Sequence, residues 1–116
     1  MAQRENKYHN VKITVDGIRF DSKAEATRYS ELKILEKAGV IRDLHLQPVF
    51  ELIPAFEKNG KKHRRRVYRA DFSYFDIEKG KTIIEDVKGL KTELYKYKKE
   101  HFEYLYPHLE ITEIFR

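Results

Sequence analysis

The chain has 116 residues, enough for one compact domain and too few for two. It has no cysteine, which excludes disulfides and thiolate metal sites, and no apolar run long enough to span a membrane. The net charge of +5 is by itself only weak evidence for a nucleic-acid partner. We therefore expect a single cytoplasmic domain over residues 1–116 that does not bind membranes, with residues 1–10 flexible.

The predicted elements alternate between strands and helices. Apolar alternation around Asp16-Gly17 predicts a hairpin, Ser22 is typical of a helix N-cap, and Gly39 and Pro107 mark helix ends. Pro48 favours an edge or a bulge within its strand. In chain order we predict strands at 11–15 and 18–20, a helix at 22–38, strands at 44–53, 65–77 and 82–88, a helix at 92–106 and a strand at 110–115. Residues 54–62 are predicted to form a loop. The expected fold is mixed α+β, with a central mixed sheet flanked by helices and an N-terminal hairpin.

Positive charge is concentrated in one short stretch. Six cations lie within nine residues: Lys61, Lys62, Arg64, Arg65, Arg66 and Arg69. A solvated hairpin tip and a nucleic-acid-binding surface explain such a run about equally well. The five histidines show no ligand spacing, so a zinc site is not expected.

Two carboxylates and a lysine are predicted to converge on neighbouring strands. Asp86 and Lys88 are two residues apart on one strand and share a face, and Asp71 lies in the middle of the adjacent predicted strand. Like charges that are close together and withdrawn from water are costly, and a divalent cation would resolve the conflict. The alternatives are a solvent-facing Asp71 and a surface ion pair between Asp86 and Lys88. Glu85 points to the opposite face and is a weaker candidate.

Glu25 has two interpretations. It fits a capping box with Ser22, in which each side chain satisfies a backbone donor of the other residue. The helical wheel favours a second role, because Glu25 and Arg28 fall on the apolar side of their helix, where charge is unusual. The residues that form this predicted apolar stripe are Ala24, Leu32, Leu35 and Ala38. Their i, i+3 spacing would let them pair. We therefore favour a role for Glu25 at the site, with capping as a further role.

Two more polar residues occupy suggestive positions. Lys98 lies in the predicted apolar stripe of the second helix, between Leu94 and Phe102, where it extends to solvent or contacts a phosphate. Gln47 shares a strand face with His45 and could reach the site or a base.

Together these elements resemble the PD-(D/E)XK nuclease superfamily. Ala70-Asp71 matches its Pro-Asp element, with alanine replacing the nominal proline, and Asp86-Val87-Lys88 matches its (D/E)-x-K element. Residues 20–115 follow its restriction-endonuclease-like order of helix, three strands, helix and strand. The pattern is also similar to small phage- or prophage-encoded nucleases and to transposase-associated endonucleases.

The resemblance implies a Mg²⁺-dependent endonuclease in which Mn²⁺ would substitute. Asp71 and Asp86, helped by Glu25 and the backbone carbonyl of Val87, would hold one or two metal ions. The metal would stabilise charge on the scissile phosphate and activate a water, which Lys88 would orient or deprotonate.

The expected partner is DNA, held through salt-dependent phosphate contacts. The sequence shows no base-reading constellation, which favours structure-directed or weakly sequence-specific cleavage in phage or mobile-element DNA processing, in a bacterial or phage-infected cell. Two alternatives stay open: a Holliday-junction resolvase acting as a homodimer, and a non-catalytic module that binds single strands through basic residues and tyrosines. The predicted DNA contacts are Lys61, Lys62, Arg64, Arg65, Arg66, Arg69 and Lys98, and the predicted supports of the site are Gln47 and Arg28.

Overall fold

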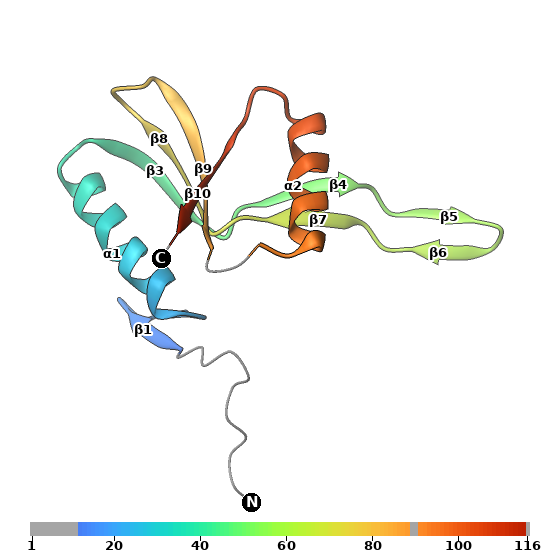
Figure 1. Cartoon of the computed structure of the whole chain (residues 1–116), viewed down its shortest axis with the longest axis horizontal. Helices are drawn as coiled ribbons and strands as arrows, with labels where there is room; N and C mark the ends of the chain where they lie inside the picture. The colour runs from blue at the N-terminus through green and yellow to red at the C-terminus, as the bar shows by residue number, and fades with distance from the viewer. Residues whose placement is uncertain (1–11, 89–90, 116) are drawn as a thin grey trace, which may run out of the picture.

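The computed structural model describes residues 12–88 and 91–115, and this part of the chain confirms the predicted mixed α+β fold. It contains two helices, a central four-stranded mixed sheet and an N-terminal hairpin (Figure 1). Residues 1–10, predicted to be flexible, and residue 11 of the first predicted strand lie outside the described residues. Neither described helix is long and apolar enough to cross a membrane.

The elements in chain order are β1 (Ile13–Val15), β2 (Ile18–Phe20), α1 (Lys23–Lys37), β3 (Ile41–Leu46), β4 (Val49–Ile53), β5 (Phe56–Lys58), β6 (Lys61–His63), β7 (Arg66–Arg69), β8 (Phe72–Asp76), β9 (Lys81–Lys88), α2 (Glu93–Leu105) and β10 (Ile111–Phe115). The central sheet has the order β10-β9-β8-β3, with β10 parallel to β9 and the other pairs antiparallel.

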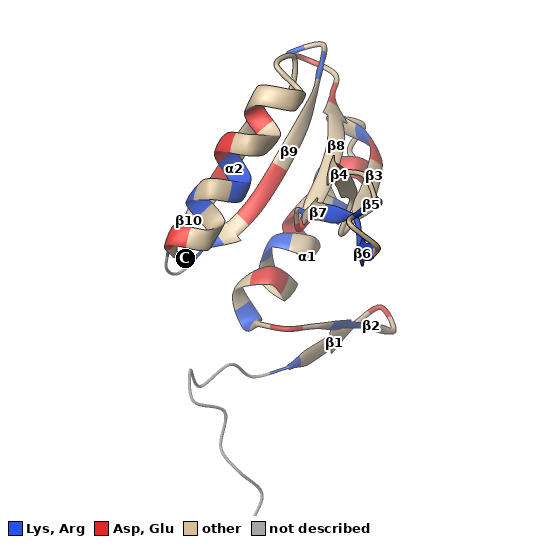
Figure 2. Ribbon diagram, turned by 90° about the vertical axis from the view of Figure 1, so that its right-hand side faces the viewer, with Lys and Arg blue, Asp and Glu red and all other residues tan. Residues whose placement is uncertain are grey.

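The two helices pack on opposite faces of the central sheet. Ile83 and Ile84 are neighbours on β9, so their side chains point to opposite faces. Ile83 packs in the core cluster that includes Leu32 of α1, whereas Ile84 packs in the cluster that includes Phe102 of α2. Figure 2 shows the acidic part of β9, in red, along the strand beside α2.

The buried face of α1 differs from the predicted stripe. Ser22 caps the helix as predicted, but the buried residues are Ala26, Tyr29 and Leu32. Tyr29 is drawn into the core because the N-terminal hairpin packs across α1, where the Phe20 ring lies 5.0 Å from the Tyr29 ring. A hairpin contact of this kind cannot be read from the helix sequence alone.

The stripe predicted for α2 is also wrong in part. Thr92 caps the helix, and Tyr95 and Phe102 are buried, but Leu94 is 65% exposed. The rotation of the helix is set by Phe50, whose ring packs edge-on against Phe102 at 4.9 Å.

The two long strands predicted at 44–53 and 65–77 are each broken in two. The breaks face each other: the Gln47 N–H donates to the Asp71 carbonyl at 2.8 Å, and the Ala70 N–H donates to the Pro48 carbonyl at 3.1 Å. Pro48 has no N–H to continue the ladder, so the chain leaves the central sheet at this point. Asp71 therefore lies at a strand junction and not in the middle of a strand as predicted.

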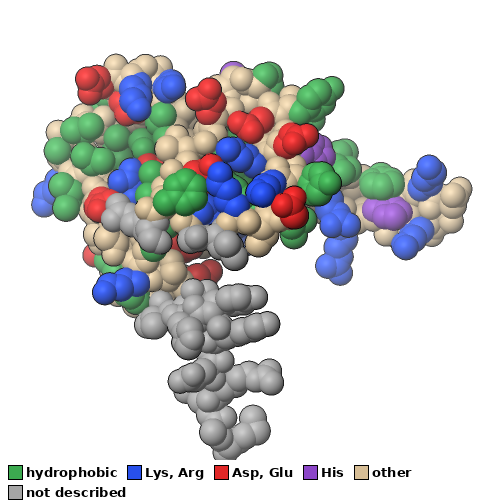
Figure 3. Space-filling view, in the orientation of Figure 1, with side chains coloured by type: hydrophobic (Ala, Val, Ile, Leu, Met, Phe, Trp, Pro, Cys, Tyr) green, Lys and Arg blue, Asp and Glu red, His purple; other side chains and the backbone are tan. Residues whose placement is uncertain are grey.

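Beyond these breaks, residues 49–69 form a projecting arm of two antiparallel ribbons (Figure 1). The ribbon β4–β7 lies next to α2, where Leu52 and Tyr68 are buried, and the ribbon β5–β6 lies at the far end. The predicted loop at 54–62 is thus largely a hairpin, turned by Asn59 and Gly60 with φ values of 52° and 76°. Lys and Arg side chains are distributed along the arm (Figure 3).

Candidate active site

Two carboxylates face each other across neighbouring strands. Asp71 directly precedes β8, and its N–H donates to the Glu85 carbonyl at 3.1 Å, next to Asp86 in β9. The Asp86 carboxylate is close enough to raise the pKa of Asp71. The Val87 N–H donates to Asp71 Oδ2 at 2.7 Å, which fixes this carboxylate against β9.

Lys88 lies beside this carboxylate pair. Asp86 is 2% exposed, and its Oδ2 accepts a hydrogen bond from the Tyr68 hydroxyl. Lys88 Nζ lies 3.5 Å from Asp86 Oδ1 and 4.1 Å from the centroid of the Tyr95 ring. The ammonium is therefore held between a buried carboxylate and an aromatic face, which restricts where it can act.

Burial and mutual repulsion disfavour ionisation of all the carboxylates at the site together. Burial raises the pKa of Asp71 to about 8, and the neighbouring carboxylates of Glu25 and Asp86 add to the effect, although the Val87 N–H opposes it. The pKa of Glu25 is also raised, first by burial and then by Asp21. A divalent cation among these carboxylates would offset their repulsion.

Glu25 reaches the site from the first turn of α1. Its backbone N–H donates to Ser22 Oγ at 3.1 Å, so the hydroxyl half of the predicted capping box is present. Its carboxylate interacts with the backbone N–H of Asp21. Glu25, Gln47 and Asp71 line a cavity of about 180 Å³. The structure thus brings Gln47 to the site, in the left-handed conformation with a φ of 51°.

The predicted DNA-binding cations fall into two groups. Arg69 and Lys98 line, together with Lys88, a groove of about 400 Å³ between β7 and the start of α2. The remaining five lie on the outer part of the arm: Lys61, Lys62, Arg64, Arg65 and Arg66. Only the first group adjoins the carboxylates.

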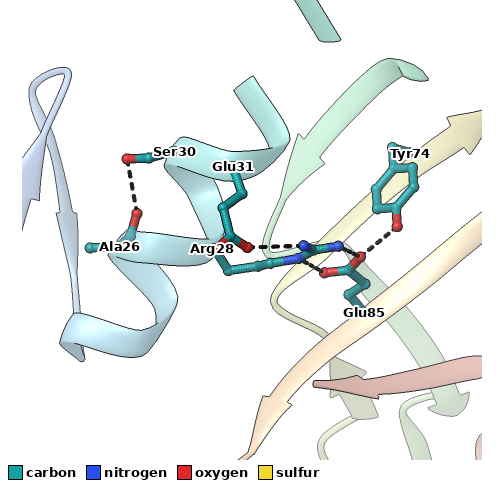
Figure 4. A network of polar contacts seen from close by, with 6 residues as sticks. All are labelled: Ala26, Arg28, Ser30, Glu31, Tyr74 and Glu85. Carbon is teal, nitrogen blue, oxygen red and sulfur yellow. Dashed lines mark hydrogen bonds and ion pairs between the residues drawn. The ribbon is translucent and has the colours of Figure 1, made fainter. Parts of the chain in front are cut away.

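Arg28 does not make the contact that we predicted. Its guanidinium contacts Glu31 and Glu85 in place of Glu25, donating to Glu85 from Nε at 2.7 Å and from Nη2 at 2.6 Å (Figure 4). Glu85 is 1% exposed and also accepts a hydrogen bond from the Tyr74 hydroxyl. The buried carboxylate of β9 is the stronger partner because it offers two oxygens to the fork of the guanidinium. Arg28 thus ties α1 to the strand that carries Asp86.

Two tyrosines at the site are not among the residues predicted from the sequence. Tyr68 and Tyr95 are buried, and their hydroxyls donate to Asp86 and Glu113. Their chemistry could have indicated them, because a buried tyrosine hydroxyl usually needs a polar partner, such as a nearby carboxylate.

The oxygen atoms at the site suit Mg²⁺ that takes only some of its ligands from the protein. Among the described residues, no group of three or more His, Cys, Asp or Glu side chains is arranged to hold a metal ion. Asp71 and Asp86 would supply two carboxylate ligands, and the Val87 carbonyl, water and substrate phosphate would supply the rest. Mg²⁺ is commonly bound by one or two carboxylates in this way. The direct ligation of metal by Glu25 stays a prediction.

The fold and the site together define a small mixed α+β protein with a carboxylate–lysine cluster at a strand junction. Over residues 5–116 the chain matches the model of a family described as "Protein of unknown function (DUF1064)", and it belongs to that family. No curated protein and no solved structure matches the chain.

Proposed function

We propose that the protein is a metal-dependent DNA endonuclease of the PD-(D/E)XK type. One observation carries the proposal: Asp71 is hydrogen-bonded to Glu85 and Val87, the two neighbours of Asp86, and Lys88 follows on the same face of β9 as Asp86. Two facing carboxylates with an adjacent ammonium are costly for folding and useful for phosphodiester hydrolysis.

Each residue has a distinct task in the proposed reaction. Asp71 and Asp86 would hold the cation, which would supply charge stabilisation at the scissile phosphate and lower the pKa of a bound water. Lys88 Nζ, held by Asp86 and Tyr95, orients that water or stabilises developing negative charge. Glu25 adds a carboxylate at the other side of the cavity, where it positions water or metal.

The DNA would approach along the groove that adjoins Lys88. Arg69 and Lys98 contribute positive charge there, next to the proposed cleavage centre, and suit phosphate contacts on either side of the scissile bond. The arm would extend the contact along the substrate. Such backbone contacts carry no sequence information, which favours structure-directed or weakly specific cleavage.

The test is the cleavage of end-labelled duplex, single-stranded and branched oligonucleotides in Mg²⁺ by matched variants. Asp71→Asn and Lys88→Ala should each lose cleavage by at least about a hundredfold, the scale of a lost acid–base or charge-stabilising group. Asp76→Asn is the control, because Asp76 is a carboxylate at the opposite end of β8, bonded to the Lys79 N–H. Circular dichroism establishes that each variant is folded. Cleavage that survives in Asp71→Asn would refute the proposal, and DNA binding without cleavage by the wild type would favour the non-catalytic module.

A further inference from the structure

The arm carries a hollow where its two ribbons join. The hollow has a volume of about 560 Å³ and is lined by Ile53, Phe56 and His63 together with basic side chains that include Arg64 and Arg66. A register shift between Glu51 and Ile53 precedes it, where β4 has one residue more than its partner strand. Bulges of this kind bend a ribbon and redirect its side chains, so the hollow is built into the course of the backbone.

An aromatic pair forms one wall of this arm hollow. Phe56 and His63 are partners across β5 and β6, and their rings stack at 4.4 Å with an interplanar angle of 9°. Figure 3 shows hydrophobic and histidine side chains together on the arm, with Lys and Arg side chains around them. Phe56 is 46% exposed, and within the described chain neither core cluster includes Phe56 or His63. Packing of the domain core therefore does not account for the pair.

The basic and aromatic lining of the hollow favours a partner that combines negative charge with a flat apolar ring. Four cations line the hollow: Lys62, Arg64, Arg65 and Arg66. Of these, Arg65 lies 3.8 Å from Glu51, and both side chains are about half exposed, so this exposed pair offsets little of the positive charge around the hollow. Nucleic acid combines phosphates with flat bases that stack on aromatic rings.

We infer that the arm hollow binds an unpaired nucleotide of the DNA substrate, with its base against Phe56 and His63 and its phosphates near Arg64 and Arg66. Bases inside a duplex are already stacked on both faces, so only a single-stranded segment can offer a free face. The preferred substrate would then be DNA that joins duplex to single strand. The choice of DNA rests on the proposed function, whereas binding in the hollow does not require cleavage.

The experiment is a fluorescence anisotropy titration of the full chain with single-stranded and duplex oligonucleotides in chelator. Phe56→Ala should weaken binding of single strands about tenfold, the effect of one lost base stack, and weaken duplex binding much less. Phe56→Tyr should restore single-strand binding, because it retains a stacking ring. Val49→Ala, which removes an exposed aliphatic side chain elsewhere on the arm, is the control. Equal losses for single strand and duplex, or no loss in Phe56→Ala, would overturn the inference.

The same preparation separates this inference from the proposed function. Cleavage by the wild type in Mg²⁺ tests the endonuclease, whereas binding in chelator tests the hollow. Cleavage accompanied by unchanged single-strand binding in Phe56→Ala would refute the hollow alone. Absence of cleavage with Phe56-dependent binding would refute the endonuclease and uphold the hollow as a single-strand site.

Discussion

The ion pair between Arg28 and Glu85 offers a strong test of the structure that is independent of function. Arg28→Met removes two short charge-assisted hydrogen bonds, of 2.7 and 2.6 Å, from a carboxylate that is 1% exposed. Of its described contacts, Glu85 then keeps the bond from the Tyr74 hydroxyl. Breaking a buried pair by removing one partner costs about 3–5 kcal/mol, because a charge is left buried. Arg28 is partly exposed, so we expect about 3 kcal/mol, a large share of the roughly 5–15 kcal/mol that stabilises a domain.

Urea unfolding followed by circular dichroism measures this loss, and an exposed pair on the same helix supplies the control. Lys33 lies 2.8 Å from Glu36 with a side chain that is 45% exposed, and Lys33→Met should cost less than about 1 kcal/mol. The double variant Arg28→Met/Glu85→Leu should recover much of the loss, since it no longer buries an unpaired charge. If Arg28→Met costs no more than Lys33→Met, the buried ion pair is not formed as described.

Three further predictions concern the site and the arm. Glu25→Gln should change stability by at most about 1 kcal/mol, because glutamine can still occupy this cap position, yet sharply reduce cleavage; full activity at ordinary Mg²⁺ would remove Glu25 from the site. Changing three arm cations to glutamine should flatten the salt dependence of duplex binding by roughly 0.9 per lost phosphate contact, and an unchanged slope would mean that the arm does not touch phosphate. The three cations are Lys62, Arg64 and Arg66. The pKa of Asp71 is raised from 3.8 to about 8 on folding, so metal-free protein should lose stability as pH rises through that window. Thermal unfolding against pH should show this decline in chelator, a weaker decline in Mg²⁺, and little of it in Asp71→Asn.

Local patterns in the sequence were sufficient to predict most of the elements. Ser22 caps the first helix as expected, and the second helix lies within the predicted range 92–106. The alternation in β9 predicted opposite faces for Glu85 and Asp86, which bond to Arg28 and Tyr68 respectively. These features depend on residues close together in the chain, which is why composition and spacing reveal them.

The features that sequence reasoning missed depend on contacts between distant segments. The break at Asp71 follows from its pairing with Gln47, and the orientation of Arg28 follows from Glu85, 57 residues away. No local period encodes either contact. Asp71 nevertheless lies close to Asp86, because its backbone N–H and its carboxylate bond to Glu85 and Val87 on either side of Asp86.

In the proposed reaction, the protein hydrolyses DNA with a divalent cation held by Asp71 and Asp86, assisted by Lys88. The most direct measurement follows supercoiled plasmid incubated with purified wild-type protein, in Mg²⁺ and in an otherwise identical sample with chelator. We expect nicked and linear product in Mg²⁺, none in chelator, and recovery when Mn²⁺ is added in excess of the chelator. Cleavage that continues in chelator, or intact plasmid in both Mg²⁺ and Mn²⁺, would contradict the proposed reaction.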